Sequence, residues 1–223
     1  MTVNITRVRI TVLVCVVMFR IGAANACESF VDPKGRSVVD FAPLSGFVDN
    51  CWRSGVCEMF LSIKSSPYYP VGLFLVPGEW DESRKGSLKG SRKQLFAQLL
   101  GPAKNDSVDD FKNVVRRWLK EPIADESESV GRTARKKVYT GVINESDGSI
   151  SWSFTERTTD REDSTLFEIL TGVGSFLKVR GETVLLYVTE VWMPPFEGGM
   201  EPNGESTITL SKRWIDCIRD KNR

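Results

Sequence analysis

The stretch "KVYTGVINESDGSISWSFT" (137–155) decides the fold class, because two alternating segments flank a run of turn-forming residues. In the second segment, 149–155, isoleucine, tryptophan and phenylalanine alternate with serine. An alternation of apolar and polar side chains with a period of two is typical of a strand that is buried on one face. The intervening "NESDG" (144–148) contains residues that favour turns. The sequence therefore predicts an antiparallel hairpin with arms at 137–143 and 149–155.

Further strands are predicted on both sides of this hairpin, where β-branched and aromatic residues gather between Gly, Pro and Ser. In chain order they are 56–64, 71–77, three segments within 164–193, and 206–210. Gly172, Gly174 and the later "RGE" are expected to divide 164–193, because glycine weakens the interior of a strand.

Three segments predict helices instead. They are 91–100, which ends at Gly101 and Pro102; 107–120, in which Ser107 and Asp110 have capping-box spacing; and 211–220, which places Trp214, Cys217 and Ile218 on one face. Strands outnumber helices and cluster after residue 136. The expected fold is a single α+β domain (27–223) with a mostly antiparallel sheet and about three helices, stabilised by disulfides.

The N-terminal residues have the order of a secretory signal peptide. Arg7 and Arg9 precede the uncharged apolar run 10–19, and Ala24 and Ala26 then occupy the positions of an A-x-A cleavage site. We expect cleavage after Ala26, with an uncleaved membrane anchor as the alternative. The apolar run is short for a transmembrane helix, which needs about 20 such residues. The expected location is the periplasm or the extracellular space, with no stable membrane insertion after residues 1–26 are removed.

Four cysteines remain in the predicted mature chain, an even number in a protein sent to an oxidising compartment, so two disulfides are expected. Cys51 and Cys57 close the short loop "CWRSGVC", in which Ser and Gly permit a turn. Cys27 then pairs with Cys217, which joins the two ends of the domain. The alternative for Cys27 is lipidation, as in a bacterial lipoprotein, but Asn25 and the missing large aliphatic residue before it fit that signal poorly.

Charge and composition exclude several classes of function. Without residues 1–26 the chain has 27 basic and 29 acidic residues, a net charge of −2, which creates no strong field for nucleic acid or anionic lipid. The whole chain contains no histidine, so Ser-His-Asp and Cys-His catalysis and histidine-based metal sites are excluded. The cysteines form no C-x-x-C motif. No cofactor, metal ligand or catalytic residue is therefore predicted.

Two long stretches, 77–93 and 193–205, are predicted to be irregular. Loops of more than about 12 residues are uncommon in compact domains and are often functional or disordered. The first contains Trp80, and the second contains Phe196 and Met200. Because aromatic residues and Met are enriched at protein interfaces, these three side chains are the predicted contact residues for a protein partner. The alternative is that the first loop is simply solvated and that Phe196 and Met200 pack onto the core.

Two functions from different classes remain. The first is a non-catalytic binding protein: an inhibitor, an immunity-type neutraliser or an accessory component of an envelope assembly. The second is a histidine-free hydrolase that uses carboxylates, most naturally on a glycan. Its candidate carboxylates are Glu79, Asp81 and Glu82 in one group and Glu156, Asp160, Glu162 and Asp163 in another, although such runs are usually solvated turns. The literal S-x-x-K match at 175–178 lacks its partner motifs and is expected to be a chance match.

Overall fold

A computed structural model describes residues 27–52, 54–55, 57–58, 68–84, 91–100, 108–120, 133–165, 167–194 and 202–223. Its strands and helices are β1 (Val48–Asp49), β2 (Tyr68–Leu75), α3 (Pro77–Arg84), β3 (Ser91–Leu100), α4 (Val108–Lys120), β4 (Thr133–Ser146), β5 (Ser149–Asp160), β6 (Phe167–Val179), β7 (Glu182–Trp192) and α5 (Glu205–Lys221).

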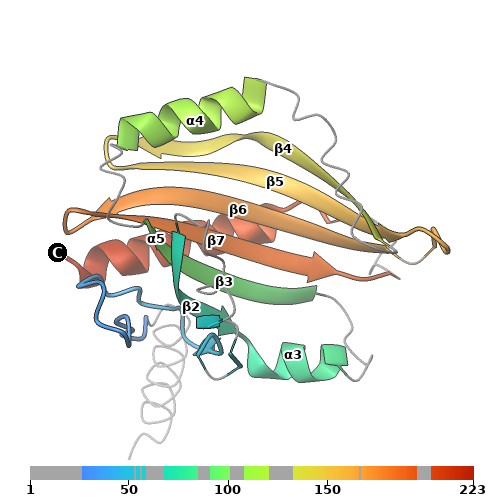
Figure 1. Ribbon diagram of the computed structural model, residues 1–223, viewed down its shortest axis with the longest axis horizontal. Coiled ribbons are helices and arrows are strands. Elements are labelled where there is room, and N and C mark those ends of the chain that lie inside the picture. Colours follow the sequence, from blue (N-terminus) through green and yellow to red (C-terminus); the bar gives the residue numbers. More distant parts are fainter. Residues whose placement is uncertain are drawn as a thin grey trace, which may run out of the picture.

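The strands form one seven-stranded sheet in the order β1-β2-β3-β7-β6-β5-β4. Every pair of neighbouring strands is antiparallel. Figure 1 shows the long strands β4 to β7 stacked in sequence, with β3 and β2 continuing the sheet beyond β7. The predicted α+β class with a mostly antiparallel sheet is therefore confirmed, and so is the hairpin, which is longer than predicted and turns at residues 147–148.

Both faces of the sheet are covered, and the alternation along β7 shows how. Val184, Leu186 and Val188 belong to a hydrophobic cluster that includes α5 and residues 39–47, whereas Leu185 belongs to a second cluster with α4. In Figure 1, α4 lies along β4 and β5 while α5 passes behind β6 and β7. We call the two sides the α5 face and the α4 face. The hairpin arm 149–155 was predicted to be buried on one face only. Its first four residues are all buried, so both faces of this part of the strand are covered.

The last helix connects the two ends of the described chain. Trp214 and Ile218 of α5 are fully buried, as the helical spacing predicted, and the indole Nε1 of Trp214 donates a hydrogen bond of 2.8 Å to the carbonyl oxygen of Phe41. Cys217 is bonded to Cys27, with Cα atoms 5.8 Å apart. Asn222 donates to the Asp40 carbonyl at 2.7 Å and accepts from the Asp40 N–H at 2.9 Å. Both predicted disulfides are present, since Cys51 is bonded to Cys57.

Gly172 and Gly174 do not divide the segment 164–193 as predicted; they lie inside the continuous strand β6. They are opposite Phe154 and Trp152 of β5 in the register, and the aromatic rings lie directly over the glycine Cα positions. A Cβ atom at either glycine would collide with the ring. Glycine is therefore required here because the large side chains of the neighbouring strand fill the space that its own side chain would occupy.

Two predicted elements have the opposite secondary structure. Residues 91–100 were predicted to be a helix and form strand β3, between β2 and β7, with Leu95, Ala97 and Leu99 buried on the α5 face. Residues 206–210 were predicted to be a strand and form the first turns of α5. In both places the packing of the segment against its neighbours overrides a local propensity that differs little between helix and strand.

The remaining predictions are met in part. Strand 71–77 corresponds to β2, and helix 107–120 to α4, with Phe111 and Val115 buried on its sheet-facing side. The predicted loop 77–93 begins with α3 and ends in β3. Of the predicted strand 56–64, Cys57 and Glu58 are helical and the rest lies outside the described residues.

The proposed signal peptide, residues 1–26, also lies outside the described residues. Within the parts of the chain that are described, no helix is both long and apolar enough to cross a membrane.

Candidate functional site

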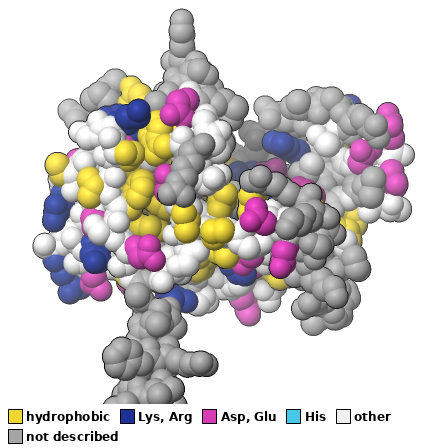
Figure 2. All heavy atoms as spheres, turned by 90° about the horizontal axis from the view of Figure 1, so that it is seen from below, with side chains coloured by type: hydrophobic (Ala, Val, Ile, Leu, Met, Phe, Trp, Pro, Cys, Tyr) yellow, Lys and Arg dark blue, Asp and Glu magenta, His cyan; other side chains and the backbone are white. Residues whose placement is uncertain are grey.

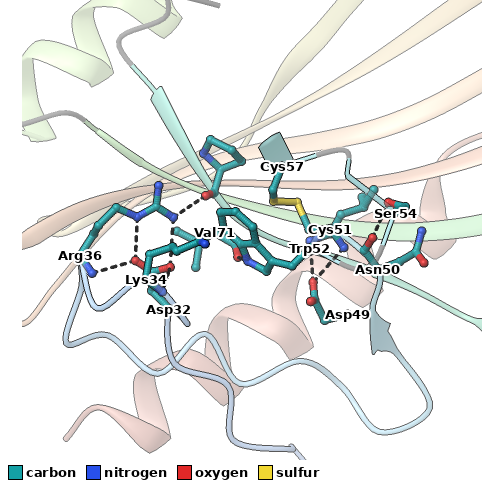
Figure 3. Close-up of a disulfide and its surroundings, with 12 residues drawn as sticks. Asp32, Lys34, Arg36, Asp49, Asn50, Cys51, Trp52, Ser54, Cys57 and Val71 are labelled. Atoms are coloured by element: carbon teal, nitrogen blue, oxygen red, sulfur yellow. Dashed lines mark hydrogen bonds and ion pairs between the residues drawn. A yellow bond between two sulfur atoms is a disulfide. The ribbon is translucent and has the colours of Figure 1, made fainter. Parts of the chain in front are cut away.

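The loop closed by Cys51 and Cys57 is fixed to the outer edge of β2, as the close-up shows (Figure 3). The Asn50 N–H donates to the Leu73 carbonyl at 2.7 Å, and Asp49 Oδ1 accepts from the Leu73 N–H at 3.3 Å. The Trp52 indole Nε1 donates to the Val71 carbonyl at 3.0 Å. These groups satisfy backbone atoms that an edge strand otherwise leaves unpaired, so the loop both closes this edge and becomes rigid.

An ion pair between the partly exposed Arg36 and the buried Asp32 supports the same edge from the N-terminal segment. Arg36 forms hydrogen bonds to both carboxylate oxygens of Asp32, at 2.9 and 3.0 Å, and its Nη2 also donates to the Pro70 carbonyl at 2.8 Å. The guanidinium of Arg36 and the ammonium of Lys34 lie 5.5 and 4.9 Å from the Trp52 ring centroid. Burial alone would raise the pKa of Asp32, but the hydrogen bonds from Arg36 and Lys34 and the charge of Arg36 together lower it.

Next to the loop is a pocket of about 170 Å³, which we call the Trp80 pocket. It is lined by Val48, Asp49, Asn50, Leu75, Pro77, Trp80 and Asp81. The apolar members come from β1, the end of β2 and the start of α3, and two carboxylates and an amide complete the wall. All of these residues belong to strands, to a helix or to the disulfide-anchored loop. The pocket is therefore formed by elements that are held in place.

Trp80 was predicted to lie on an accessible irregular loop, but it is partly buried in helix α3. The guanidinium of Arg92 lies 5.2 Å from the centroid of its ring, and Arg92 is in turn 3.7 Å from Glu168. Arg92 thus restrains the indole, which forms one wall of the pocket. Asp81, one residue further along α3, is exposed. Among the described residues Asp81 has no ion-pair partner, whereas Asp49 is occupied by backbone N–H groups.

The described surface also carries exposed apolar side chains. Figure 2 views the molecule from below the orientation of Figure 1, the side on which the N-terminal segment, β2 and α3 lie, and shows apolar side chains in a band among charged ones. Val31 and Val38 of the N-terminal segment, Val48 of β1 and Tyr69 of β2 are 38–63% exposed. Of these four residues only Val48 lines the Trp80 pocket.

The other predicted site residues are placed as follows. Phe196 and Met200, predicted to contact a partner, lie outside the described residues. All four cysteines are where the disulfide prediction put them. Of the carboxylates considered for a hydrolase, Glu79 accepts from the Lys93 backbone N–H at 2.8 Å. Hydrogen bonds from Thr165 lower the pKa of Asp163, and Asp160 accepts from the backbone N–H of Glu162 and of Asp163. The contacts of Asp160 and Asp163 are the local contacts of a turn, whereas the contact of Glu79 links α3 to β3.

Apart from Trp80 and Asp81, the residues that line the pocket were not predicted as site residues. For Val48 and Asp49 the reason is that no periodicity marks a two-residue strand. The described residues contain no group of three or more acidic or cysteine side chains that could hold a metal ion.

A comparison of the chain with models of protein families finds no match, and a comparison with curated proteins finds no relative. Any assignment of function therefore depends on the geometry of the surface itself.

Proposed function

We propose that this chain is an exported, non-catalytic binding protein that holds another protein through the Trp80 pocket, and that its place of action is the periplasm or the extracellular space. The observation that carries the proposal is a pocket with apolar and polar walls on well-anchored elements, at whose rim Asp81 has no ion-pair partner among the described residues. The two disulfides are compatible with an oxidising compartment. A rigid pocket needs little ordering on binding, which favours affinity.

The chemistry of the pocket fits a basic side chain of the partner. The methylene stem of a Lys or Arg would pack on Val48, Leu75 and Trp80, while its charged end would meet the carboxylate of Asp81. Long basic side chains bury their stems against apolar surfaces in this way and keep the charge hydrated. A cation beside the Trp80 ring would also be attracted by the electrons of the indole.

The direct test uses small probes, N-acetyl-arginine amide and N-acetyl-norleucine amide, titrated into the isotope-labelled mature protein. We expect the arginine probe to shift the resonances of the Trp80 indole and the Val48 amide, and the norleucine probe to shift them more weakly. Asp81→Asn should weaken binding of the arginine probe about three- to tenfold, since a charged hydrogen bond contributes about 1 kcal/mol or somewhat more at a partly exposed site.

The matched control is Asp147→Asn in the exposed turn between β4 and β5, which makes the same chemical change away from the pocket. This variant should bind the probe like the wild type. Trp80→Ala should abolish the shifts while the protein stays folded by circular dichroism. If the probe shifts resonances elsewhere, or if Trp80→Ala and Asp81→Asn leave its affinity unchanged, the pocket is not the binding site.

A further inference from the structure

A second depression lies on the α5 face, between α5 and the strands β4 and β5, and has a volume of about 230 Å³. Its polar lining consists of Asn144, Ser151, Ser211, Lys212, Asp216 and Arg219, and two isoleucine side chains complete it. We call it the α5 groove. It shares no lining residue with the Trp80 pocket and is formed by other elements, so an occupant here would be independent of the protein partner proposed above.

The sheet beneath this groove is polar, whereas the neighbouring part of the α5 face, at Val184 and Leu186 of β7, is apolar. Ser149, Ser151 and Ser175 are at most 1% exposed, whereas the same face of β7 carries Val184 and Leu186. The Ser175 hydroxyl donates to the Ser151 hydroxyl at 2.8 Å. A buried hydroxyl adds little to a hydrophobic core and must keep a hydrogen-bond partner. Strands β5 and β6 therefore offer hydroxyl groups beneath the groove, beside the apolar cluster of the same face.

The helix side of the groove supplies charge. Lys212, Asp216 and Arg219 follow one another at intervals of four and three residues, which places them on one face of α5. Arg219 Nη2 donates to the Ser149 hydroxyl at 3.0 Å, and this bond fixes the guanidinium at one end of the groove. Among the described residues, neither Lys212 nor Asp216 has an ion-pair partner. The lining thus presents two cations and one carboxylate that no described residue neutralises.

We propose that the α5 groove binds a small molecule that carries two carboxylates and one ammonium group, the chemistry of an acidic amino acid such as glutamate. One carboxylate meets the planar fork of Arg219, which matches a carboxylate geometrically, and the second meets Lys212. The ammonium meets Asp216, while Ser151 and Asn144 supply neutral hydrogen-bonding groups. The volume lies between about 150 Å³, which suffices for benzene, and the 300 Å³ or more of drug-sized pockets, so it suits a ligand of this size.

The test is isothermal titration calorimetry of the mature, disulfide-bonded protein with L-glutamate, L-glutamine and glutarate. L-Glutamine lacks one carboxylate and glutarate lacks the ammonium, so each is expected to bind about tenfold more weakly than L-glutamate. Lys212→Gln should weaken L-glutamate binding by a similar factor. Lys221→Gln, the same change on an exposed residue of the same helix outside the groove, should leave it unchanged.

Asp216→Asn gives the most specific readout, because it should weaken the binding of L-glutamate and leave that of glutarate unchanged. Lys212 and Asp216 are exposed, so both substitutions are expected to preserve the fold. Two results overturn the proposal: no heat of binding with L-glutamate at about 10 mM, or an L-glutamate affinity that is the same in the wild type, Lys212→Gln and Asp216→Asn.

Discussion

Glu190 is a charged residue in the central strand β7 that is only 2% exposed, and its contacts explain how the sheet tolerates it. Its carboxylate accepts hydrogen bonds from the hydroxyls of Ser91 in β3 and Ser206 in α5, and Lys93 Nζ lies 3.3 Å away. It also lies beside the N-terminus of α5, where the helix dipole favours a negative charge. One side chain thus connects two neighbouring strands to the helix that covers them.

Removing this carboxylate is expected to destabilise the protein strongly. Glu190→Ala leaves two hydroxyls and the ammonium of Lys93 without their shared acceptor, and should lower the free energy of unfolding by about 3 kcal/mol. Chemical denaturation measures the change. The control is Glu168→Ala in β6, whose ion pair with Arg92 is half exposed at 3.7 Å and should contribute less than about 1 kcal/mol. Equal effects of the two substitutions would contradict the structural role of Glu190.

Asp32 should make the stability depend on pH in the acidic range. Its pKa in the folded protein is lowered below the ordinary value of 3.8, so the ionised form stabilises the fold above that pH. The contribution is lost as the pH falls through the lower pKa of the folded state. Asp32→Asn is therefore expected to lower the free energy of unfolding by about 2 kcal/mol at pH 7, with a difference that narrows below pH 3.8. A difference that stays constant down to a pH of about 2 would show that the charge of Asp32 is not involved.

In the register of β5 and β6, large aromatic side chains of β5 lie opposite glycines of β6. Because the Trp152 ring occupies the space above Gly174, the substitution Gly174→Ala should lower the free energy of unfolding by about 2–3 kcal/mol, the effect of overpacking a core. Gly78→Ala in α3 is the control, since its Cβ would meet no atom within 4 Å and alanine favours a helix. The midpoint of thermal unfolding, measured for both variants, tests this prediction. If Gly174→Ala is as stable as Gly78→Ala, the close contact of the ring does not constrain β6.

The elements differ in how well the sequence predicts them, and the difference has a physical cause. The hairpin and α4 were predicted because each has a clear periodicity, although the serine side of the hairpin arm 149–155 is buried as well as its aromatic side. Segment 91–100 contains Leu, Ala, Gln and Lys, which favour helices, yet it lies between two strands whose backbone groups it must satisfy. Only the sheet order reveals that requirement. A local pattern carries no information about which neighbours a strand acquires.

The candidate site was predictable to a smaller degree. Trp80 stood out in the sequence as a large aromatic residue among Gly, Ser and charged residues, and it does line a pocket. The other walls come from residues 48–50 and from Leu75, which meet it only because β1 pairs with β2 beside α3. The α5 groove was not predicted either, because the serine side of the hairpin was expected to face solvent. Its burial depends on where α5 lies, which the hairpin sequence does not encode.

At the scale of the whole molecule the two disulfides should stabilise the fold unequally. The bond between Cys27 and Cys217 closes a loop with a sequence separation of 190 residues, whereas the other separation is 6. The chain-entropy model gives about 5 kcal/mol for the first and about 2 kcal/mol for the second. The double variant Cys27→Ser/Cys217→Ser is therefore expected to have a lower denaturation midpoint than Cys51→Ser/Cys57→Ser. The opposite order would mean that the local anchoring of the short loop outweighs the restriction of the unfolded chain.

The long disulfide also determines how the protein responds to mechanical force. A tension applied between residues near 27 and 217 is carried by the covalent bond, so the hydrogen bonds of the sheet and the packing of α5 experience almost none of it. In a single-molecule stretching experiment the oxidised chain should extend by only a few residues, and reduction should release about 660 Å of additional length, at about 3.5 Å for each of the 190 residues. An unfoldase that pulls the chain through a pore would have to admit two strands at once, or stop at the bond between Cys27 and Cys217.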